Sequence, residues 1–194
     1  MISKHNINKT KCIRLAAEVR SEIGLEPMDA LDPWKLAQLY GIMVIPLSTL
    51  PLSSVIRNYF SITRQEVFSG ALVPFRHGTV IIENDSHSNA RRRSTMSHEL
   101  AHVFGEHSFG TSLANGRGCR MVDQVQEEEA AEISGELLIP FEAAKKLARN
   151  DTTDEEVALR FGVSTDMARW RLNATGARRI AAHQNITYRR SHRA

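Results

Sequence analysis

The segment His98–His102, which reads His-Glu-Leu-Ala-His, constrains the fold of this chain more than any other. It lies in a run where Met96, Leu100, Val103 and Phe104 recur at helical spacing, which predicts an amphipathic helix over about residues 89–104. Side chains four residues apart lie on one face of a helix, so both histidines can reach one ion. The fold must therefore bury the apolar side of this helix next to a metal site.

The histidine pair predicts a zinc site, because imidazole binds zinc at about 2.0–2.1 Å. Glu99 lies one residue round the helix from His98, which leaves it off the ligand face but within reach of a metal-bound water. A carboxylate there can take the proton of the water and pass it to a leaving amine. We therefore predict His98 and His102 as metal ligands and Glu99 as the catalytic general base, with Zn2+ as cofactor and Mn2+ as the alternative.

A third ligand is needed, since a catalytic zinc ion takes three protein ligands and keeps one position open. The extended pattern His-Glu-x-x-His-x-x-Gly-x-x-His includes Gly105 but would place its last histidine at Ser108. His107 comes one residue early, so we expect it beside the metal ligands or near the reacting carbonyl oxygen, or as an ordinary loop histidine.

An acid from the next predicted helix, about residues 123–138, is the other source of a third ligand. Its glutamates are Glu127, Glu128, Glu129, Glu132 and Glu136. Most of them must face solvent, and the apolar stripe through Ala130, Ile133 and Leu137 favours Glu129 or Glu136 without separating them. Glu127 and Glu128 fall further from this stripe.

The order of the predicted elements indicates an α+β fold, because helices dominate both ends and a few strands lie between them. The predicted helices cover about residues 9–23, 33–40, 89–104, 123–138, 141–149, 153–162 and 164–172. The predicted strands are 42–45, 67–73 and 79–83, the last two forming a hairpin, and residues 48–66 are expected to be irregular.

The charge is unevenly distributed, since residues 177–194 carry five arginines and no acid while the whole chain has a net charge of +3. Residues 1–176 therefore carry −2, which disfavours nucleic-acid binding by the body of the protein. Residues 157–172 resemble a helix-turn-helix, but acids outnumber arginines over residues 153–176, so we expect a structural or substrate-docking role. We divide the chain into a core with the predicted metal site (1–140), a helical subdomain packed on it (141–176) and a flexible basic tail (177–194). The tail is the one segment suited to contact nucleic acid.

Composition narrows the setting of the protein. The longest apolar run is about four residues, far below the roughly 20 that a membrane-spanning helix needs. Residues 1–10 are polar and lack the apolar stretch of a secretion signal, and two cysteines, Cys12 and Cys119, cannot form a disulfide scaffold. We expect a cytoplasmic protein with no membrane partner and reduced thiols; the sequence leaves the oligomeric state open.

Three stretches resemble the ImmA/IrrE family of metallo-endopeptidases. They are the arginine-rich approach to the histidine pair (92–102), the segment Glu-Ala-Ala-Glu-Ile-Ser-Gly-Glu-Leu-Leu-Ile-Pro (129–140), and the C-terminal segment Phe-Gly-Val-Ser followed by Ala-Arg-Trp-Arg-Leu (161–164 and 168–172). The resemblance spans about residues 30–176. It departs from the family pattern at Ala131, Ile133 and Ser134, where Asp or Asn, Phe and Ala are usual.

The resemblance implies a zincin-like fold with a small three-stranded sheet and a gluzincin-like site of two histidines and one glutamate. It implies His98, His102 and Glu129 as ligands and Glu99 as general base. It further implies a helix-turn-helix repressor as substrate, whose cleavage derepresses stress-response or mobile-element genes, or a role in a toxin–antitoxin pair. The alternative from another class is a non-catalytic module that binds DNA or a repressor, with a structural metal closed by a fourth ligand such as His107 or Cys119.

Overall fold

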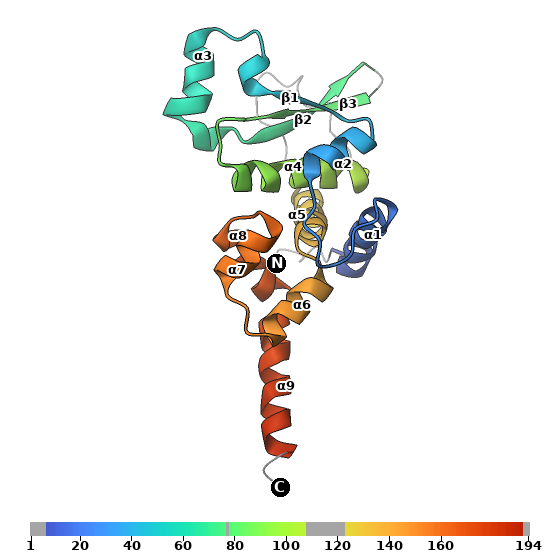
Figure 1. Ribbon diagram of the computed structural model, residues 1–194. Helices are drawn as coiled ribbons and strands as arrows, with labels where there is room; N and C mark the ends of the chain where they lie inside the picture. Colours follow the sequence, from blue (N-terminus) through green and yellow to red (C-terminus); the bar gives the residue numbers. More distant parts are fainter. Residues whose placement is uncertain (1–6, 77, 108–122, 192–194) are drawn as a thin grey trace, which may run out of the picture.

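The computed structural model describes residues 7–76, 78–107 and 123–191, with side chains up to residue 184. Over these residues, helices surround a small sheet, which confirms the expected α+β class (Figure 1). The elements are α1 (Lys9–Glu22), α2 (Pro33–Leu39), β1 (Met43–Pro46), η1 (Leu47–Thr49), α3 (Ser54–Asn58), η2 (Tyr59–Thr63), η3 (Gln65–Val67), β2 (Gly70–Phe75), β3 (Gly78–Glu83), α4 (Asn89–Phe104), α5 (Gln124–Leu138), α6 (Phe141–Arg149), α7 (Asp154–Phe161), α8 (Thr165–Ala174) and α9 (Ala177–Ser191).

Over the described residues the sheet has three strands, the number that the resemblance implies, and their order is β1-β3-β2. β3 pairs in parallel with β1 and antiparallel with β2, so that Ile81 lies opposite both Val44 and Leu72. The expected hairpin of β2 and β3 is confirmed. α4 lies along one face of the sheet in Figure 1 and contacts β2 and β3, which brings the His98–His102 segment next to strand β2.

Local sequence signals set several of the helix ends. The Asp32 side chain accepts hydrogen bonds from the backbone N–H groups of Trp34 and Lys35 at the start of α2. α7 begins with a complete capping box, in which Thr153 and Glu156 bond each other's backbone N–H groups. Both helices therefore begin where the sequence predicts.

Residues 48–66, expected to be irregular, instead form short helical turns. A tertiary contact holds this segment, because the buried Asn84 side chain donates to the carbonyls of Phe60 and Phe68, each at 2.9 Å. The sequence of residues 48–66 gives no sign of this contact, because Asn84 lies outside the segment. The prediction of irregular structure for these residues was therefore wrong.

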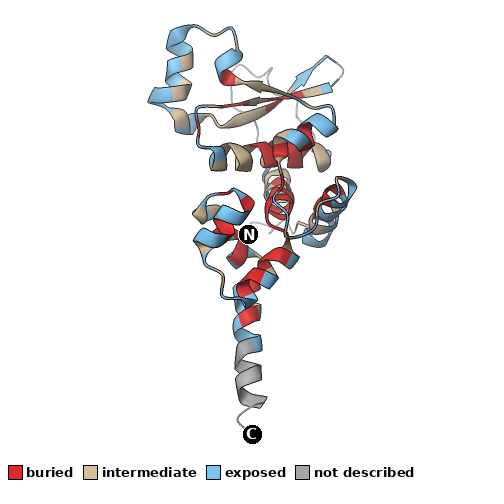
Figure 2. Cartoon of the chain, viewed as in Figure 1, coloured by how far each residue is buried: buried red, intermediate tan, exposed pale blue. Residues whose placement is uncertain are grey.

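Buried apolar side chains form two clusters that meet in α5 (Figure 2). The first runs from Cys12 to Leu137 and fills the space between the sheet, α1, α2, α4 and α5. The second begins at Leu138 and runs to Ala181 through α6, α7, α8 and the start of α9. α5 is therefore the element that both cores share.

The C-terminal segment expected as a flexible tail begins as helix α9, which extends away from the body in Figure 1. Its first turns are anchored, since Ala177 and Ala181 are buried in the second cluster. Among the described helices, none combines the length and apolar character that crossing a bilayer requires.

Candidate metal centre

Helix α4 presents His98 and His102 one turn apart on the same face. The helix starts at Asn89 after its N-cap Ser88, whose side chain accepts from the backbone N–H of Arg91, and it ends at Phe104 before the C-cap Gly105. The two Nε2 atoms lie 3.2 Å apart. The His102 side chain is buried at 3% exposure, whereas that of His98 is 32% exposed, so the pair lies at the boundary between core and solvent.

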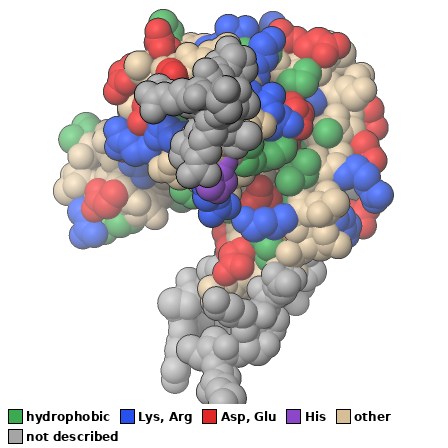
Figure 3. Space-filling view, turned by 90° about the horizontal axis from the view of Figure 1, so that it is seen from below, with side chains coloured by type: hydrophobic (Ala, Val, Ile, Leu, Met, Phe, Trp, Pro, Cys, Tyr) green, Lys and Arg blue, Asp and Glu red, His purple; other side chains and the backbone are tan. Residues whose placement is uncertain are grey.

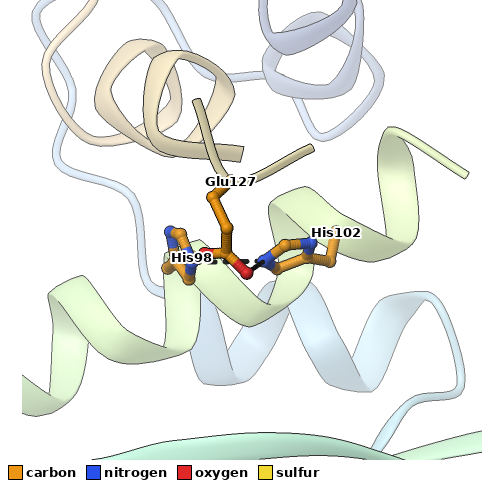
Figure 4. A group of neighbouring side chains, drawn as sticks. All are labelled: His98, His102 and Glu127. Carbon is orange, nitrogen blue, oxygen red and sulfur yellow. Dashed lines mark hydrogen bonds and ion pairs between the residues drawn. The ribbon is translucent and has the colours of Figure 1, made fainter. Parts of the chain in front are cut away.

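Glu127, in the first turn of α5, completes a convergent group with these histidines (Figure 4). Its carboxylate oxygens lie 3.1 Å from the Nε2 of His98 and 3.6 Å from that of His102. Tetrahedral ligand atoms around zinc, each about 2.0–2.1 Å from the ion, are separated by about 3.3–3.4 Å. The three side chains therefore fit a zinc-sized ion, and two imidazoles with one carboxylate form a donor set that zinc accepts.

Glu129, the third ligand implied by the resemblance, lies elsewhere in this arrangement. Its carboxylate is 3.4 Å from the Nε2 of His107, and the Nδ1 of His107 is 2.9 Å from the Nδ1 of His102. Residues two apart on a helix are rotated by about 200°, so Glu127 and Glu129 cannot point at the same atom. Glu127 and Glu129 lie on opposite sides of His102, and Glu129 as a ligand stays a prediction.

His107 contacts the Nδ1 atom of His102, whereas Glu127 lies near the Nε2 atom on the other side of the same ring. The His107 side chain is buried at 3% exposure. His107 thus contacts a predicted metal ligand, and its role beside the metal stays a prediction. Ser108 and Cys119, the other positions weighed for a metal ligand, lie outside the described residues.

Glu99 is buried at 7% exposure and shares a cavity of about 420 Å³ with its neighbour His98. Strand β2 comes very close here, because a Cβ atom at Gly70 would lie 2.6 Å from the Thr95 side chain and 3.6 Å from Cγ of Glu99. The absence of a side chain at Gly70 thus lets β2 pack directly against the face of α4 that carries Glu99. The cavity is large enough for part of a peptide.

Glu136, the other glutamate that the apolar pattern favoured, has a structural role. Its carboxylate accepts from the backbone N–H of Phe141 at 3.0 Å and pairs with Arg171. Arg171 is fully buried and also donates to the Ile139 carbonyl at 2.9 Å and to Glu132 at 2.8 Å. Burial raises the pKa of Glu136. These contacts bind α8 to α5 on the side away from the metal centre.

The sequence argument did not favour Glu127, because it ranked the glutamates by their distance from the buried apolar stripe of α5. A second face of α5 carries four residues at helical spacing, which are Glu127, Ala131, Ser134 and Leu138. The last three of these residues line the cavity. A metal with an open position belongs at such a cleft rather than in a core. The small residues Ala131 and Ser134 on the same face as Glu127 were the available signal.

Comparison with protein families gives a match, and comparison with curated proteins gives none. The model of a peptidase family, described as the IrrE N-terminal-like domain, matches residues 39–173. This range contains the sheet, both helices of the metal centre, and all of α6 and α7.

Proposed function

Because this chain belongs to the metallopeptidase family of IrrE N-terminal-like domains, we propose that it is a zinc-dependent endopeptidase with His98, His102 and Glu127 as metal ligands. One observation carries the proposal: ligand atoms from α4 and α5 converge at the separations of a tetrahedral zinc site, beside a cavity that Glu99 lines. Glu129 is the alternative third ligand. Mn2+ is the alternative ion, since the donor set does not select between them.

Glu99 is the general base in this proposal. When bound, zinc lowers the pKa of a coordinated water to about 7. Glu99 would take a proton from the attacking water, whose oxygen adds to the peptide carbonyl. It would then deliver this proton to the amine nitrogen as the C–N bond breaks, which leaves a free carboxyl terminus and a free amino terminus. This role is supported by the position of Glu99, which lines the same cavity as His98.

Strand β2 provides a surface on which an extended peptide can bind. It lies at one edge of the sheet formed by the described strands, and Gly70 at its start lines the same cavity as His98 and Glu99. An extended segment can add to such an edge through backbone hydrogen bonds. Binding along a strand favours cleavage within a chain over removal of a terminal residue.

The proposed substrate is a helix-turn-helix repressor, whose cleavage would derepress stress-response or mobile-element genes. A toxin–antitoxin partner is the second candidate. Both come from the family resemblance, and both need a segment of the substrate that can become extended to reach β2. A protein encoded by a neighbouring gene is the first substrate to test.

The geometry disfavours the alternative of a DNA-binding module with a structural metal. Of the α8 arginines, Arg171 is buried, and Arg169 pairs with Asp154 and Asp166 at 3.0 and 3.2 Å. Acidic and basic side chains are interspersed on the face shown in Figure 3. His107, the described candidate for a fourth ligand, contacts the far nitrogen of His102. Phosphate binding that survives metal removal would favour this alternative.

Metal content tests the ligand set, with a series of adjacent glutamates as internal controls. We expect about one zinc ion per wild-type chain, a large loss in Glu127→Ala, and full occupancy in Glu128→Ala, because Glu128 is exposed and bonds Gln124. Loss in Glu129→Ala with retention in Glu127→Ala would assign the site to Glu129 instead. A wild-type chain that takes up no metal from supplied zinc would overturn the peptidase proposal.

Activity then tests the role of Glu99. A Glu99→Gln variant should bind zinc like the wild type and cleave the repressor about 10²- to 10⁴-fold more slowly, the range typical of losing a general base. The measurement is the rate of product formation on gels, with metal content determined on the same preparations. Cleavage by Glu99→Gln at the wild-type rate would contradict the assignment.

A further inference from the structure

The cavity beside the metal centre has a wall built by the C-terminal helices rather than by the peptidase core. His98 and Glu99 of α4 line this cavity together with Met167 and Trp170 of α8. In Figure 1, α7 and α8 lie below the N-terminal end of α4, which starts at Asn89. The C-terminal helical pair is thus part of the cleft.

The Trp170 ring has a defined position against α5. A Cβ atom at Gly135 would lie 3.0 Å from Cζ3 and 3.2 Å from Cη2 of the indole, which shows that the ring packs directly on the backbone of this helix. Ala131 and Ser134, on the cleft face of α5, are also small. Small residues on α5 therefore make the space that the indole and the cavity share.

The helix that carries Trp170 is held rigidly. The adjacent Arg171 is fully buried and bonds Glu132, Glu136 and the carbonyl of Ile139, all from α5 or its C-terminal end. Trp170 itself keeps 42% of its surface exposed. A large aromatic side chain on a fixed helix, partly exposed in a cavity next to catalytic groups, provides a preformed binding surface.

The lining of the cavity selects for apolar groups. Among the described residues that line it, the titratable ones are His98 and Glu99, and none is a lysine or an arginine. The carboxylate of Glu99 disfavours an acidic side chain, and neither Met167 nor Trp170 offers a counter-charge that would offset the desolvation of a basic one. Indole and thioether groups pack well with aromatic and branched aliphatic side chains.

We infer that Met167 and Trp170 form a specificity subsite that receives a large apolar side chain of the substrate next to the cleaved bond. This inference rests on the proposed peptidase function and adds the substrate preference of that same site. It assigns the C-terminal helical pair a direct role in substrate selection. Phe, Leu and Met are the expected occupants.

The preference is tested with synthetic 12-residue peptides in which each position is sampled by Ala, Leu, Phe, Glu and Lys. Zinc-loaded full-length protein is incubated with the pool, and mass spectrometry gives relative kcat/KM values by position. For the wild type we expect Phe or Leu to be favoured at least tenfold over Ala at one position flanking the cleaved bond, as even one methylene in an apolar pocket changes selectivity about 10-fold or more. Trp170→Ala should reduce this ratio at least fivefold.

Leu159→Ala is the matched control, because Leu159 is an apolar residue of the same helical pair that is 86% exposed and does not line the cavity. Its preference ratio should equal that of the wild type. Trp170→Phe should still favour Phe or Leu over Ala, but by a smaller ratio than the wild type. A partial ratio in this variant shows that the preference depends on contact with the ring and not on loss of the fold. An unchanged ratio in Trp170→Ala would overturn the subsite even if cleavage itself is robust.

A binding measurement separates the subsite from the peptidase proposal. The chain has two tryptophans, Trp34 and Trp170, so fluorescence of the non-cleaving Glu99→Gln protein reports peptide binding. A Phe-containing peptide of the pool should change the emission, its Ala counterpart should require at least tenfold more peptide, and the added variant Trp170→Phe should abolish the change. If the Phe-containing peptide changes the fluorescence but the wild type cleaves none of the peptides, the subsite is supported and the peptidase proposal is refuted. If this peptide causes no fluorescence change, the subsite is refuted.

Discussion

His102 is contacted on both of its ring nitrogens, and this determines how a metal ligand is held. Its Nε2 faces His98 and Glu127, while its Nδ1 lies 2.9 Å from His107. If a metal takes the Nε2 atom, the Nδ1–H of His102 donates to His107, whose Nε2–H then faces Glu129 at 3.4 Å. In this arrangement Glu129 would be connected to the site through His107 rather than through the ion.

This arrangement predicts graded effects on metal affinity. His107→Ala should weaken zinc binding about 10- to 100-fold, the usual cost of losing a partner of a ligating histidine. Glu129→Ala should weaken it less, because Glu129 acts only through His107. The measurement is competition for zinc with a chromophoric chelator, with Glu128→Ala as the control. Equal losses in Glu127→Ala and Glu129→Ala would show that both carboxylates touch the metal.

At the scale of elements, α5 joins the metal centre to the C-terminal helices. Its first turn supplies Glu127, its cleft face lines the cavity, and its last turns hold Arg171 through Glu132 and Glu136. One helix therefore sets both the ligand position and the place of α8. Disturbing its C-terminal end should affect stability first.

Removing the buried arginine should be costly. Arg171→Ala leaves Glu132 and Glu136 without their buried counter-charge, so we expect a loss of about 3–5 kcal/mol in the free energy of unfolding. Arg169→Ala removes a half-exposed ion pair and should cost about 0–1 kcal/mol. Urea unfolding at pH 7 compares the two. Similar small losses in both variants would show that the buried network contributes little.

The same network predicts a pH dependence. Desolvation opposes ionisation of Glu132, but its hydrogen bond and attraction to Arg171 prevail and hold the pKa of Glu132 below its ordinary value of 4.5. A lowered pKa in the folded state contributes stability above the unfolded pKa, and this contribution is lost as the pH falls through the folded pKa. The difference in unfolding free energy between wild type and Glu132→Gln should therefore shrink below about pH 4.5. A difference that grows on acidification would contradict the assignment.

At the scale of the whole molecule, two cores share one helix, and the candidate metal centre ties that helix to the one beneath the sheet. The candidate ligands His98 and His102 come from α4, and the candidate ligand Glu127 comes from α5. An ion bound between them would cross-link the two helices. Metal binding should therefore be coupled to the stability of the complete chain.

Thermal unfolding measures this coupling. Zinc at 100 times its Kd should raise the free energy of unfolding by about 2.7 kcal/mol, since the ion binds the folded chain and little of the unfolded one. The melting temperature should rise accordingly on adding zinc and fall with a chelator. Glu127→Ala should show little of this shift. A similar zinc-induced shift in Glu127→Ala would place the stabilising ion at another site.

The sequence alone determined the features of this protein that depend on the spacing of residues within one element. Helical periodicity and a four-residue separation put His98 and His102 on one face of α4, and capping residues such as Asp32 and Thr153 set where helices begin. The motifs likewise sufficed to indicate the family, because they are contiguous. Angles within one helix follow from backbone geometry alone.

The tertiary structure decided which residues meet across elements. It brought Glu127 rather than Glu129 to the two histidines, since the rotation of α5 against α4 depends on packing along both helices. It also brought Trp170 into the cavity, through contacts of Arg171 with residues 35 and 39 positions earlier in the chain. The relative placement of two helices is fixed by side chains distant in sequence, which local patterns do not report.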